Sequence, residues 1–387
     1  MSLTPTRPPA DLPAVAAAFP LHGLYVEGVP YGSGHINDTF AVTMDQAGRS
    51  VRYIFQRIND RVFKNVPALM ENIQRVTSHM ARSVPSTGPV DSRHALTLVG
   101  TRGGDAWHRD ASGAAWRCYL FIEKARTYDL VENPRQACEA ARAFGEFQRS
   151  LVDLPGDRLH ETIPAFHDTR ARFETFRRAV AADRSGRARE VQAEIEFAMA
   201  REPMSDVLLD LVARGEVPER ITHNDTKFNN VMLDDATARG VCVIDLDTVM
   251  PGVALYDFGD MVRSATNAAA EDERDVAKVA MRMDIFEGLL TGYAASAGVF
   301  LNPVERAHLA FSGKLITYEI GLRFLTDHLE GDVYFKIKRP GHNLDRCRTQ
   351  FALVASIERQ ESAMQSLADR IFHNLAAQPA VPGRNAQ

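Results

Sequence analysis

The chain has 387 residues and a formal net charge of −5, with 45 lysines and arginines against 50 aspartates and glutamates. Because one domain usually has ~100–200 residues, this length predicts two domains or lobes. Apolar residues make up 45% and charged residues 25%, a composition that excludes a disordered chain, a collagen-like repeat and a coiled-coil rod. The acidic balance and the lack of a long basic run also argue against a nucleic-acid-binding protein.

Cysteine spacing and hydropathy predict a soluble protein of the cytoplasm. The four cysteines include no C-x-x-C pair, so neither a disulfide framework nor a structural zinc site is indicated. No segment approaches the ~18 uninterrupted apolar residues that span a bilayer, so we expect no membrane association. Residues 1–20 contain five prolines and lack the basic start of a signal peptide, and we expect this segment to be flexible. The sequence does not indicate an oligomeric state.

The first third of the chain is rich in β-strand patterns. Short β-rich runs at residues 24–42, 51–58 and 116–122 are broken by glycine and aspartate, and one helical stretch at 66–80 lies between them. We therefore expect a small α+β unit over residues 21–123.

After residue 124 the apolar spacing becomes helical and predicts a mainly α-helical unit over residues 124–376. The helices are expected at residues 134–151, 169–180, 187–212, 277–297, 303–329 and 344–376. Two short apolar strands, 230–233 and 241–244, flank a turn-rich stretch, so we expect a β-hairpin inserted among the helices. Residues 377–387, rich in Ala, Pro, Gly and Asn, are expected to be disordered.

The predicted hairpin carries the strongest chemical motif. Residues 222–230 read THNDTKFNN, which gives H-x-D-x-x-x-x-N, the spacing of a kinase catalytic loop. In such a loop Asp225 accepts the proton of the attacking hydroxyl group, and Asn230 is an oxygen ligand of a magnesium ion. Asp245 follows at the end of a buried strand, where a second magnesium ligand is expected. Because the two motifs support each other, we interpret the hairpin as a phosphoryl-transfer site.

Residues next to these three are expected to support the site. His223 is expected to fix the loop rather than to act as an acid or base. Asp247 either assists the metal or caps the following turn. Asp257 either caps a helix or orients the catalytic loop. Lys227 lies inside the motif and is taken as a further supporting residue.

A second motif near the N-terminus suggests a phosphate-binding turn. Residues 31–39 read YGSGHINDT, and the backbone N–H groups of Gly32, Ser33 and Gly34 would approach phosphate oxygens closely. A plain hairpin turn gives the same pattern. The strand that follows has no lysine to hold the phosphates, so Arg57 is the candidate cation.

Residues 119–124, YLFIEK, connect the two predicted units. They read as a strand that runs into a linker, where Phe121 and Glu123 mark a suitable place for backbone hydrogen bonds to adenine. An ordinary buried edge strand is the alternative. A P-loop is excluded because no G-x-x-x-x-G-K-[ST] occurs in the chain.

The chain resembles the aminoglycoside phosphotransferase and choline kinase-type enzymes, and within them the bacterial N-acetylhexosamine 1-kinases. The resemblance covers about residues 20–375. It is carried by GSGHINDTF at 32–40, FQRINDRVFKNVPALMENI at 55–73, THNDTKFNNVMLD at 222–234, VIDLDTVMPG at 243–252, YDFGD at 256–260 and LRFLTDHLEGDVYF at 322–335.

This resemblance implies an α+β, bilobal protein-kinase-like fold, with a small β-rich N-terminal lobe that binds the nucleotide and a larger helical C-terminal lobe with a catalytic β-hairpin. It implies ATP and Mg²⁺, with Asp225 as the catalytic base and a small-molecule sugar as the substrate, phosphorylated at its anomeric hydroxyl group. By the same resemblance His35, Asp225, Arg323 and Tyr334 contact the sugar. The only D-F-G, at residues 257–259, comes too late to be the metal strand, and this disfavours a protein substrate.

Alternatives to the sugar remain open at this point. Arg323 could pair with Glu319 on one helix face, and Tyr334 could be a core anchor. A kinase of the same fold could act on another small alcohol, such as an aminoglycoside, a choline-like amine or homoserine. A non-catalytic nucleotide-binding relative is the third class, and the intact catalytic loop argues against it.

Overall fold

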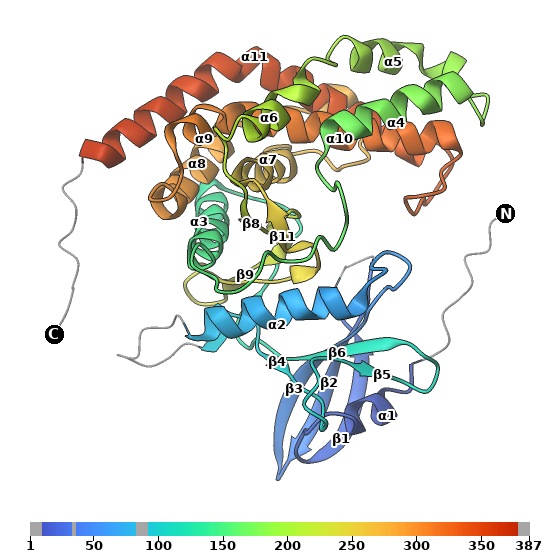
Figure 1. Ribbon diagram of the computed structural model, residues 1–387, viewed down its shortest axis with the longest axis vertical. Coiled ribbons are helices and arrows are strands. Elements are labelled where there is room, and N and C mark those ends of the chain that lie inside the picture. Colours follow the sequence, from blue (N-terminus) through green and yellow to red (C-terminus); the bar gives the residue numbers. More distant parts are fainter. Residues whose placement is uncertain (1–9, 33–35, 83–91, 378–387) are drawn as a thin grey trace. The chain divides into compact units, whose positions relative to one another are not determined.

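The computed structural model describes residues 10–32, 36–82 and 92–377. The chain divides into two compact units, Met1–Lys124 and Ala125–Gln387. Figure 1 shows the first unit as a β-sheet with few helices and the second as a mainly helical body. This is the mixed architecture that the sequence predicts, with a β-sheet N-terminal lobe and a helical C-terminal lobe. The predictions for Ser33, Gly34, His35 and residues 378–387 lie outside the described residues.

The first unit is built on one antiparallel sheet with the strand order β1-β2-β3-β6-β4, and β5 pairs with β6. Its strands are β1 (Leu24–Pro30), β2 (Asp38–Gln46), β3 (Arg49–Arg57), β4 (Leu98–Val99), β5 (His108–Arg109) and β6 (Ala115–Leu120). Its helices are α1 (Leu12–Ala17), α2 (Val66–Arg82) and the 3₁₀ turn η1 (Ser92–His94). The first three strands follow one another along the chain as a meander, so local pairing builds most of the sheet.

Residues 10–20 are ordered, which corrects the prediction of a flexible segment over 1–20. Asp11 caps α1, because its Oδ1 accepts the Ala14 backbone N–H at 3.1 Å, and Pro13 lies in the first turn, where a helix needs no N–H donor. Leu12 and Phe19 are buried in one core with Phe55 and other residues of the sheet. Pro13 is therefore compatible with the start of a short helix, and burial of the apolar side chains of this helix against the sheet stabilises it.

The second unit contains the predicted hairpin. β9 (Val231–Asp234) pairs with β10 (Gly240–Val243), and β7 (Ala125–Arg126) extends this sheet on the β9 side. A second ribbon pairs β8 (Arg220–Thr222) with β11 (Met250–Gly252). Both ribbons border the segment that carries the catalytic motif.

Helices make up the rest of the second unit. They are α3 (Pro134–Ser150), α4 (Thr169–Ala182), α5 (Gln192–Met199), α6 (Met204–Ala213), α7 (Ala254–Ala265), α8 (Met283–Ala297), α9 (Pro303–Ala307), α10 (Leu309–Glu330) and α11 (His342–Ala377). 3₁₀ turns lie at η2 (Ala188–Val191), η3 (Phe228–Asn230), η4 (Leu246–Thr248) and η5 (Val276–Lys278). Two predicted helices are split, at Pro203 and at His308. Proline cannot continue a helix from the preceding turn, which explains the first break.

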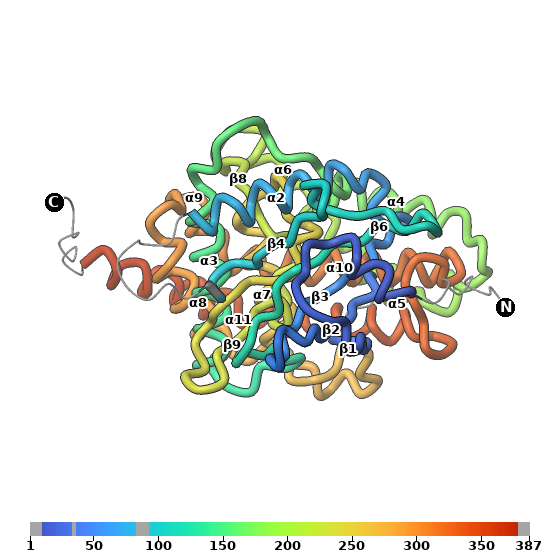
Figure 2. The backbone as a smooth tube through the Cα atoms, turned by 90° about the horizontal axis from the view of Figure 1, so that it is seen from below, coloured from blue at the N-terminus to red at the C-terminus, as the bar shows by residue number. Residues whose placement is uncertain are grey.

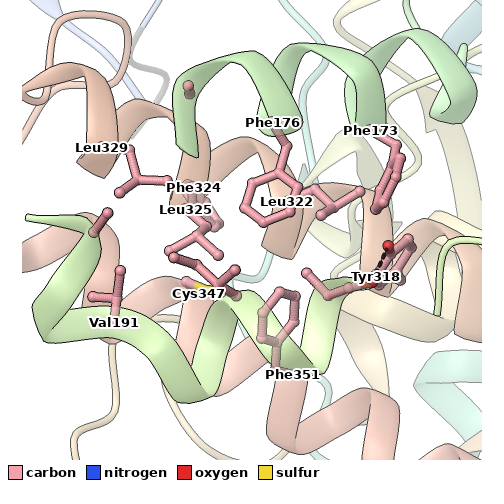
Figure 3. Packing of buried hydrophobic residues seen from close by; sticks show 14 of the residues in the cluster. Phe173, Phe176, Val191, Tyr318, Leu322, Phe324, Leu325, Leu329, Cys347 and Phe351 are labelled. Atoms are coloured by element: carbon pink, nitrogen blue, oxygen red, sulfur yellow. Dashed lines mark hydrogen bonds between the residues drawn. The ribbon is translucent and has the colours of Figure 1, made fainter. Parts of the chain in front are cut away.

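The core of the helical body lies between α4, α10 and α11. Figure 3 shows Phe173 and Phe176 from α4 packed toward Leu325 of α10 and Phe351 of α11. α11, red in Figures 1 and 2, has 36 residues and packs along α10. In the part of the chain that the structure describes, no helix has both the length and the apolar character that a membrane crossing requires. This core holds α10 in place, and α10 carries Glu319 and Arg323.

Candidate active site

The catalytic loop of the second unit connects β8 to β9. Asp225 lies 3.1 Å from the Nζ of Lys227, measured to its Oδ2. The Nδ2 of Asn230 donates to the Asp225 backbone carbonyl at 2.8 Å and lies 3.4 Å from Oδ2. The residue before Asp225, Asn224, has a left-handed backbone with φ +63°. A non-glycine residue rarely adopts this conformation, so the surrounding contacts must hold it.

His223 connects the catalytic loop to the strand that leads to Asp245. Its Nε2 lies 2.9 Å from the Ile244 carbonyl, and its Nδ1 lies 3.3 Å from the Asp225 backbone N–H. Because a carbonyl only accepts and a backbone N–H only donates, these contacts require a neutral ring with its proton on Nε2. The ring packs edge-on against Phe144 and Phe147. These contacts support the structural role predicted for His223.

Asp257 holds the backbone of the loop. It lies in the first turn of α7 but is not the N-cap of this helix, because the N-cap is Val253. Its Oδ2 accepts the His223 backbone N–H at 2.9 Å, and its Oδ1 accepts the Asn224 backbone N–H at 2.6 Å. Gln148 also donates to Oδ2, at 2.6 Å. Burial raises the pKa of Asp257, and these hydrogen bonds oppose that rise. Of the two interpretations of this residue, the contacts support orientation of the loop.

Asn230 and Asp245 are neighbours across the hairpin. The Ile244 backbone N–H donates to the Asn230 carbonyl at 2.9 Å, which puts Asp245 directly after the paired residue. Asp245 itself has a left-handed backbone, with φ 61° and ψ 60°. Since the Nδ2 of Asn230 faces the Asp225 carbonyl, the amide Oδ1 points the other way. One carboxylate and one amide oxygen are a donor set that magnesium accepts, with water and phosphate oxygens completing its shell. The residues present therefore fit this ion.

The charges around Asp225 keep its carboxylate ionised. Burial acts to raise its pKa, but the ammonium group of Lys227 leads the groups that hold the pKa below its usual value, and Arg263 adds to this effect. Asp225 is in turn the main cause of the raised pKa of Lys227, followed among the raising groups by Asp260 and Asp245. At neutral pH the site thus has a proton-accepting carboxylate beside a fixed ammonium group.

Asp247 lies in the adjacent turn and is buried, and its backbone carbonyl accepts the Thr162 hydroxyl at 2.9 Å.

A pocket of about 140 Å³ opens beside α10 in the same unit. It is lined by Arg172, Thr175, Arg323, Thr326, Asp327, Glu330, Tyr334 and Phe335. The Arg323 guanidinium lies 5.8 Å from the centre of the Tyr334 ring. Tyr334 is 64% exposed, so it is not a core anchor. Of the four residues predicted to contact the sugar, Arg323 and Tyr334 line this pocket, Asp225 is not among its lining residues, and His35 lies outside the described residues.

A second guanidinium group, that of Arg172, lines the same pocket. Burial lowers its pKa, and the nearby charge of Arg323 adds to the shift. Its Nη2 donates to the Phe166 carbonyl at 3.1 Å, whereas its Nε is buried and has no hydrogen-bond partner among the described residues. Asp327, which also lines the pocket, accepts the backbone N–H groups of residues 333–335 and is thereby occupied. The pocket wall therefore offers N–H donors to a ligand.

In the first unit, the position of Arg57 differs from the prediction. Successive residues of a strand point to opposite faces, and Arg57 shares the α1 side with Phe55 and its cross-strand neighbour Trp116, both in the core with α1. Its guanidinium pairs there with Asp38 at 2.8 Å. The opposite face carries Gln56, so Arg57 is not the cation of that face.

That opposite face carries a row of polar groups. Gln56 donates to the Thr39 hydroxyl at 3.0 Å and accepts from the Nε of Arg117 at 2.9 Å. Arg117 is almost fully buried and is the cation that lies beside Gln56 on this face, a residue that no sequence motif singled out. Because side chains alternate along a strand, the sequence places Arg57 on the same face as Phe55 and away from Gln56. The pairing that brings Arg117 beside Gln56 is not visible in the sequence.

The same face has exposed apolar side chains near the predicted nucleotide residues. Val29 and Tyr31 are exposed, and the Tyr31 ring lies 5.4 Å from that of Phe121. The Arg52 guanidinium covers Phe121 at 3.7 Å from the ring centre and forms an ion pair with Glu123. Gly32 follows Tyr31 with φ +78°, a conformation that glycine adopts without strain. This face can therefore receive a flat apolar group beside a glycine turn.

The chain matches the phosphotransferase enzyme family (APH) over residues 27–295, more than half of its length. The chain belongs to this family. Three solved structures share the fold. An aminoglycoside phosphotransferase from Alicyclobacillus acidocaldarius is 14% identical, with a TM-score of 0.59, and the match covers 96% of this chain and 99% of that one. A choline/ethanolamine kinase family protein from Mesorhizobium loti is 16% identical, with a TM-score of 0.51 and coverage of 94% and 98%. A spectinomycin phosphotransferase in complex with ADP and spectinomycin is 12% identical, with a TM-score of 0.50 and coverage of 87% and 92%.

Proposed function

We propose that this small-molecule phosphotransferase is an ATP- and Mg²⁺-dependent sugar 1-kinase, which transfers the γ-phosphate to the anomeric hydroxyl group of an N-acetylhexosamine or a related sugar. The observation that carries the proposal is the ionised Asp225 held between Lys227 and Asn230, in the same unit as a pocket walled by Arg323 and Tyr334. The first group performs the transfer, and the second offers donors to a polyhydroxylated acceptor.

The nucleotide would bind to the first unit. The sheet face with Val29, Tyr31 and Phe121 would receive the adenine, and Gly32 begins the turn whose backbone would approach the phosphates. Arg117 and Gln56 stand where a strand lysine is absent, and we propose them for the phosphate side in place of Arg57. The ADP bound by the spectinomycin phosphotransferase of similar fold supports nucleotide use.

The second unit would carry the chemistry. As the acceptor oxygen bonds to the γ-phosphorus, the bond from phosphorus to the β–γ bridging oxygen breaks and leaves ADP, and Asp225 accepts the hydroxyl proton. Lys227 lies beside Asp225 and would neutralise charge on the transferred phosphoryl group. Asn230 and Asp245 would hold Mg²⁺, which when bound neutralises charge on the β- and γ-phosphates.

The pocket favours one acceptor class over another. Arg172 and Arg323 present two guanidinium groups to the pocket, which Asp327 and Glu330 also line. Because Asp327 already accepts backbone N–H groups, we expect a polycationic aminoglycoside or a quaternary amine to meet repulsion from the arginines that Glu330 offsets only in part. A neutral sugar with hydroxyl and carbonyl oxygens would instead accept their N–H groups. The same two groups also suit an alcohol that carries a carboxylate, such as homoserine, which is the second candidate.

A coupled ADP-release screen tests the proposal. It compares hexoses, N-acetylhexosamines, amino alcohols, homoserine and aminoglycosides, with Asp225→Asn as the matched inactive control. We expect turnover with the N-acetylhexosamines and at least ~100-fold less in the control, the low end for loss of a general base. Turnover with aminoglycosides or choline alone would refute the acceptor class but leave the phosphotransferase intact.

A further inference from the structure

A buried histidine connects the catalytic loop to α10. His167 lies just before α4, and its Nε2 is 3.1 Å from the Asn224 carbonyl. Its Nδ1 is 2.8 Å from the Oε1 of Glu319, whose other oxygen accepts the Thr169 hydroxyl at 2.6 Å. All four residues are buried. Glu319 is thus engaged away from Arg323, which corrects the expectation that these two might simply pair.

The hydrogen bonds determine where the protons lie. The Asn224 carbonyl only accepts, so the Nε2 of His167 carries a proton. An ionised Glu319 also only accepts, so Nδ1 then carries a second proton and the ring is an imidazolium. The environment agrees: burial acts to lower the pKa of His167, but Glu319, Asn224 and Asp260 raise it overall. Burial acts to raise the pKa of Glu319, and His167 leads the groups that lower it overall.

Other elements also face this ring. From α7, the Tyr256 ring lies 5.1 Å away and Asp260 adds negative charge. The preceding residue, Phe166, packs edge-on at 4.7 Å between the ring centres. Arg323 adds positive charge on the Glu319 side. The carboxylates of Glu319 and Asp260 therefore both act on His167 and favour its charged form.

The pair of His167 and Glu319 connects the catalytic loop to the helix turn that carries Arg323. Asn224 has the left-handed backbone that precedes Asp225, and its carbonyl, the atom that His167 contacts, belongs to the peptide that joins the two residues. Glu319 lies on α10 one helical turn before Arg323, the residue of the pocket wall. The chain of contacts therefore runs from the wall of the pocket to the peptide of the catalytic base.

We propose that the imidazolium–carboxylate pair of His167 and Glu319 is a positioning device that fixes the Asn224–Asp225 peptide relative to the acceptor pocket. His167 touches no reacting atom and acts through Asn224. The proposal rests on the proposed function only in that Asp225 is the base, and it holds for whichever acceptor is phosphorylated. Removing the Nε2 contact should lower kcat, because a misplacement of about 1 Å can cost ~100-fold in rate.

Two variants separate the two hydrogen bonds. Asparagine at 167 places its amide near Nδ1, toward Glu319, whereas glutamine places its amide near Nε2, toward Asn224. We expect His167→Asn to lower kcat by ~10- to 100-fold at a nearly unchanged KM for ATP, and His167→Gln to lose clearly less. The exposed His373, changed to Asn and Gln, is the matched control and should show no effect. Equal kcat losses in both His167 variants, or full kcat in His167→Asn, would overturn the positioning role.

A second measurement does not depend on turnover. In ¹⁵N-histidine-labelled full-length protein, NMR at pH 7 should show protons on both ring nitrogens of His167, and Glu319→Gln should remove one of them. A single protonated nitrogen in the wild-type protein would overturn the charged pair. Failure of the proposed function gives a different result, because Asp225→Asn would then retain turnover while the NMR signature of His167 stays the same.

Discussion

Replacing Asp257 with asparagine tests how strongly its carboxylate holds the backbone of the catalytic loop. The carboxylate accepts three N–H groups, from His223, Asn224 and Gln148, on its two oxygens. An asparagine amide has one oxygen, so at least one buried N–H loses its acceptor and faces another N–H donor. Loss of that bond costs ~1–3 kcal/mol, and the remaining bonds lose their charge assistance, so we expect about 2–4 kcal/mol in the free energy of unfolding.

Urea unfolding and steady-state kinetics measure the two consequences of Asp257→Asn. The loop backbone at Asn224 should shift, and kcat should fall by ~10- to 100-fold, because the base is displaced. Asp284→Asn is the control, since Asp284 is exposed and also lies in the first turn of a helix, α8. It should cost only the helix-dipole contribution of ~0.3–1 kcal/mol. An Asp257→Asn variant as stable and as active as Asp284→Asn would refute the loop-orienting role.

Asp225→Asn should lower kcat by at least ~100-fold while ATP still binds, as measured by turnover and nucleotide titration; near-wild-type turnover would remove Asp225 from the mechanism. Asp245→Ala should abolish metal-dependent turnover with an unchanged circular dichroism spectrum, and activity that survives EDTA would contradict the magnesium assignment. Arg323→Ala should raise KM for the acceptor by ~10-fold or more and leave KM for ATP nearly unchanged, and equal losses for both would contradict its placement. For the buried pair, the pKa of His167 is raised above its ordinary value of 6.5, so its contribution to stability is complete below pH 6.5 and is lost as the pH rises through the raised pKa. The pKa of Glu319 is lowered below its ordinary value of 4.5, so its contribution is complete above pH 4.5 and is lost as the pH falls through the lowered pKa. The excess unfolding free energy of wild type over His167→Gln should therefore be largest between pH 4.5 and 6.5, and a difference that grows toward alkaline pH in urea unfolding would exclude the charged pair.

Local patterns predicted the β-hairpin well. The motif from His223 to Asn230 and the strand before Asp245 lie close together in sequence, and short-range pairing of β9 with β10 forms the hairpin. Apolar periodicity also placed most helices within a few residues. Its failures have local causes, because a proline splits one predicted helix, and Met281 forms an isolated bridge with Asn267 just before α8 begins.

The contacts that hold the site could not be predicted in the same way. His167 meets partners 57 and 152 residues away in sequence, and one histidine before a helix has no pattern that reveals them. Arg117 likewise reaches Gln56 only through the pairing of β3 with β6. Such long-range polar contacts depend on the packed fold, whereas the catalytic motif depends on spacing along the chain.

The position of the phosphate on the product tests the central claim most directly. The chain is incubated with ATP, Mg²⁺ and an N-acetylhexosamine, and the product is examined by phosphorus–proton NMR. We expect coupling of the phosphorus to the anomeric proton, because the acceptor oxygen beside Asp225 is proposed to be that of C1. Coupling to the protons of C6 or C3, or phosphate found only on an amino alcohol, would contradict the account.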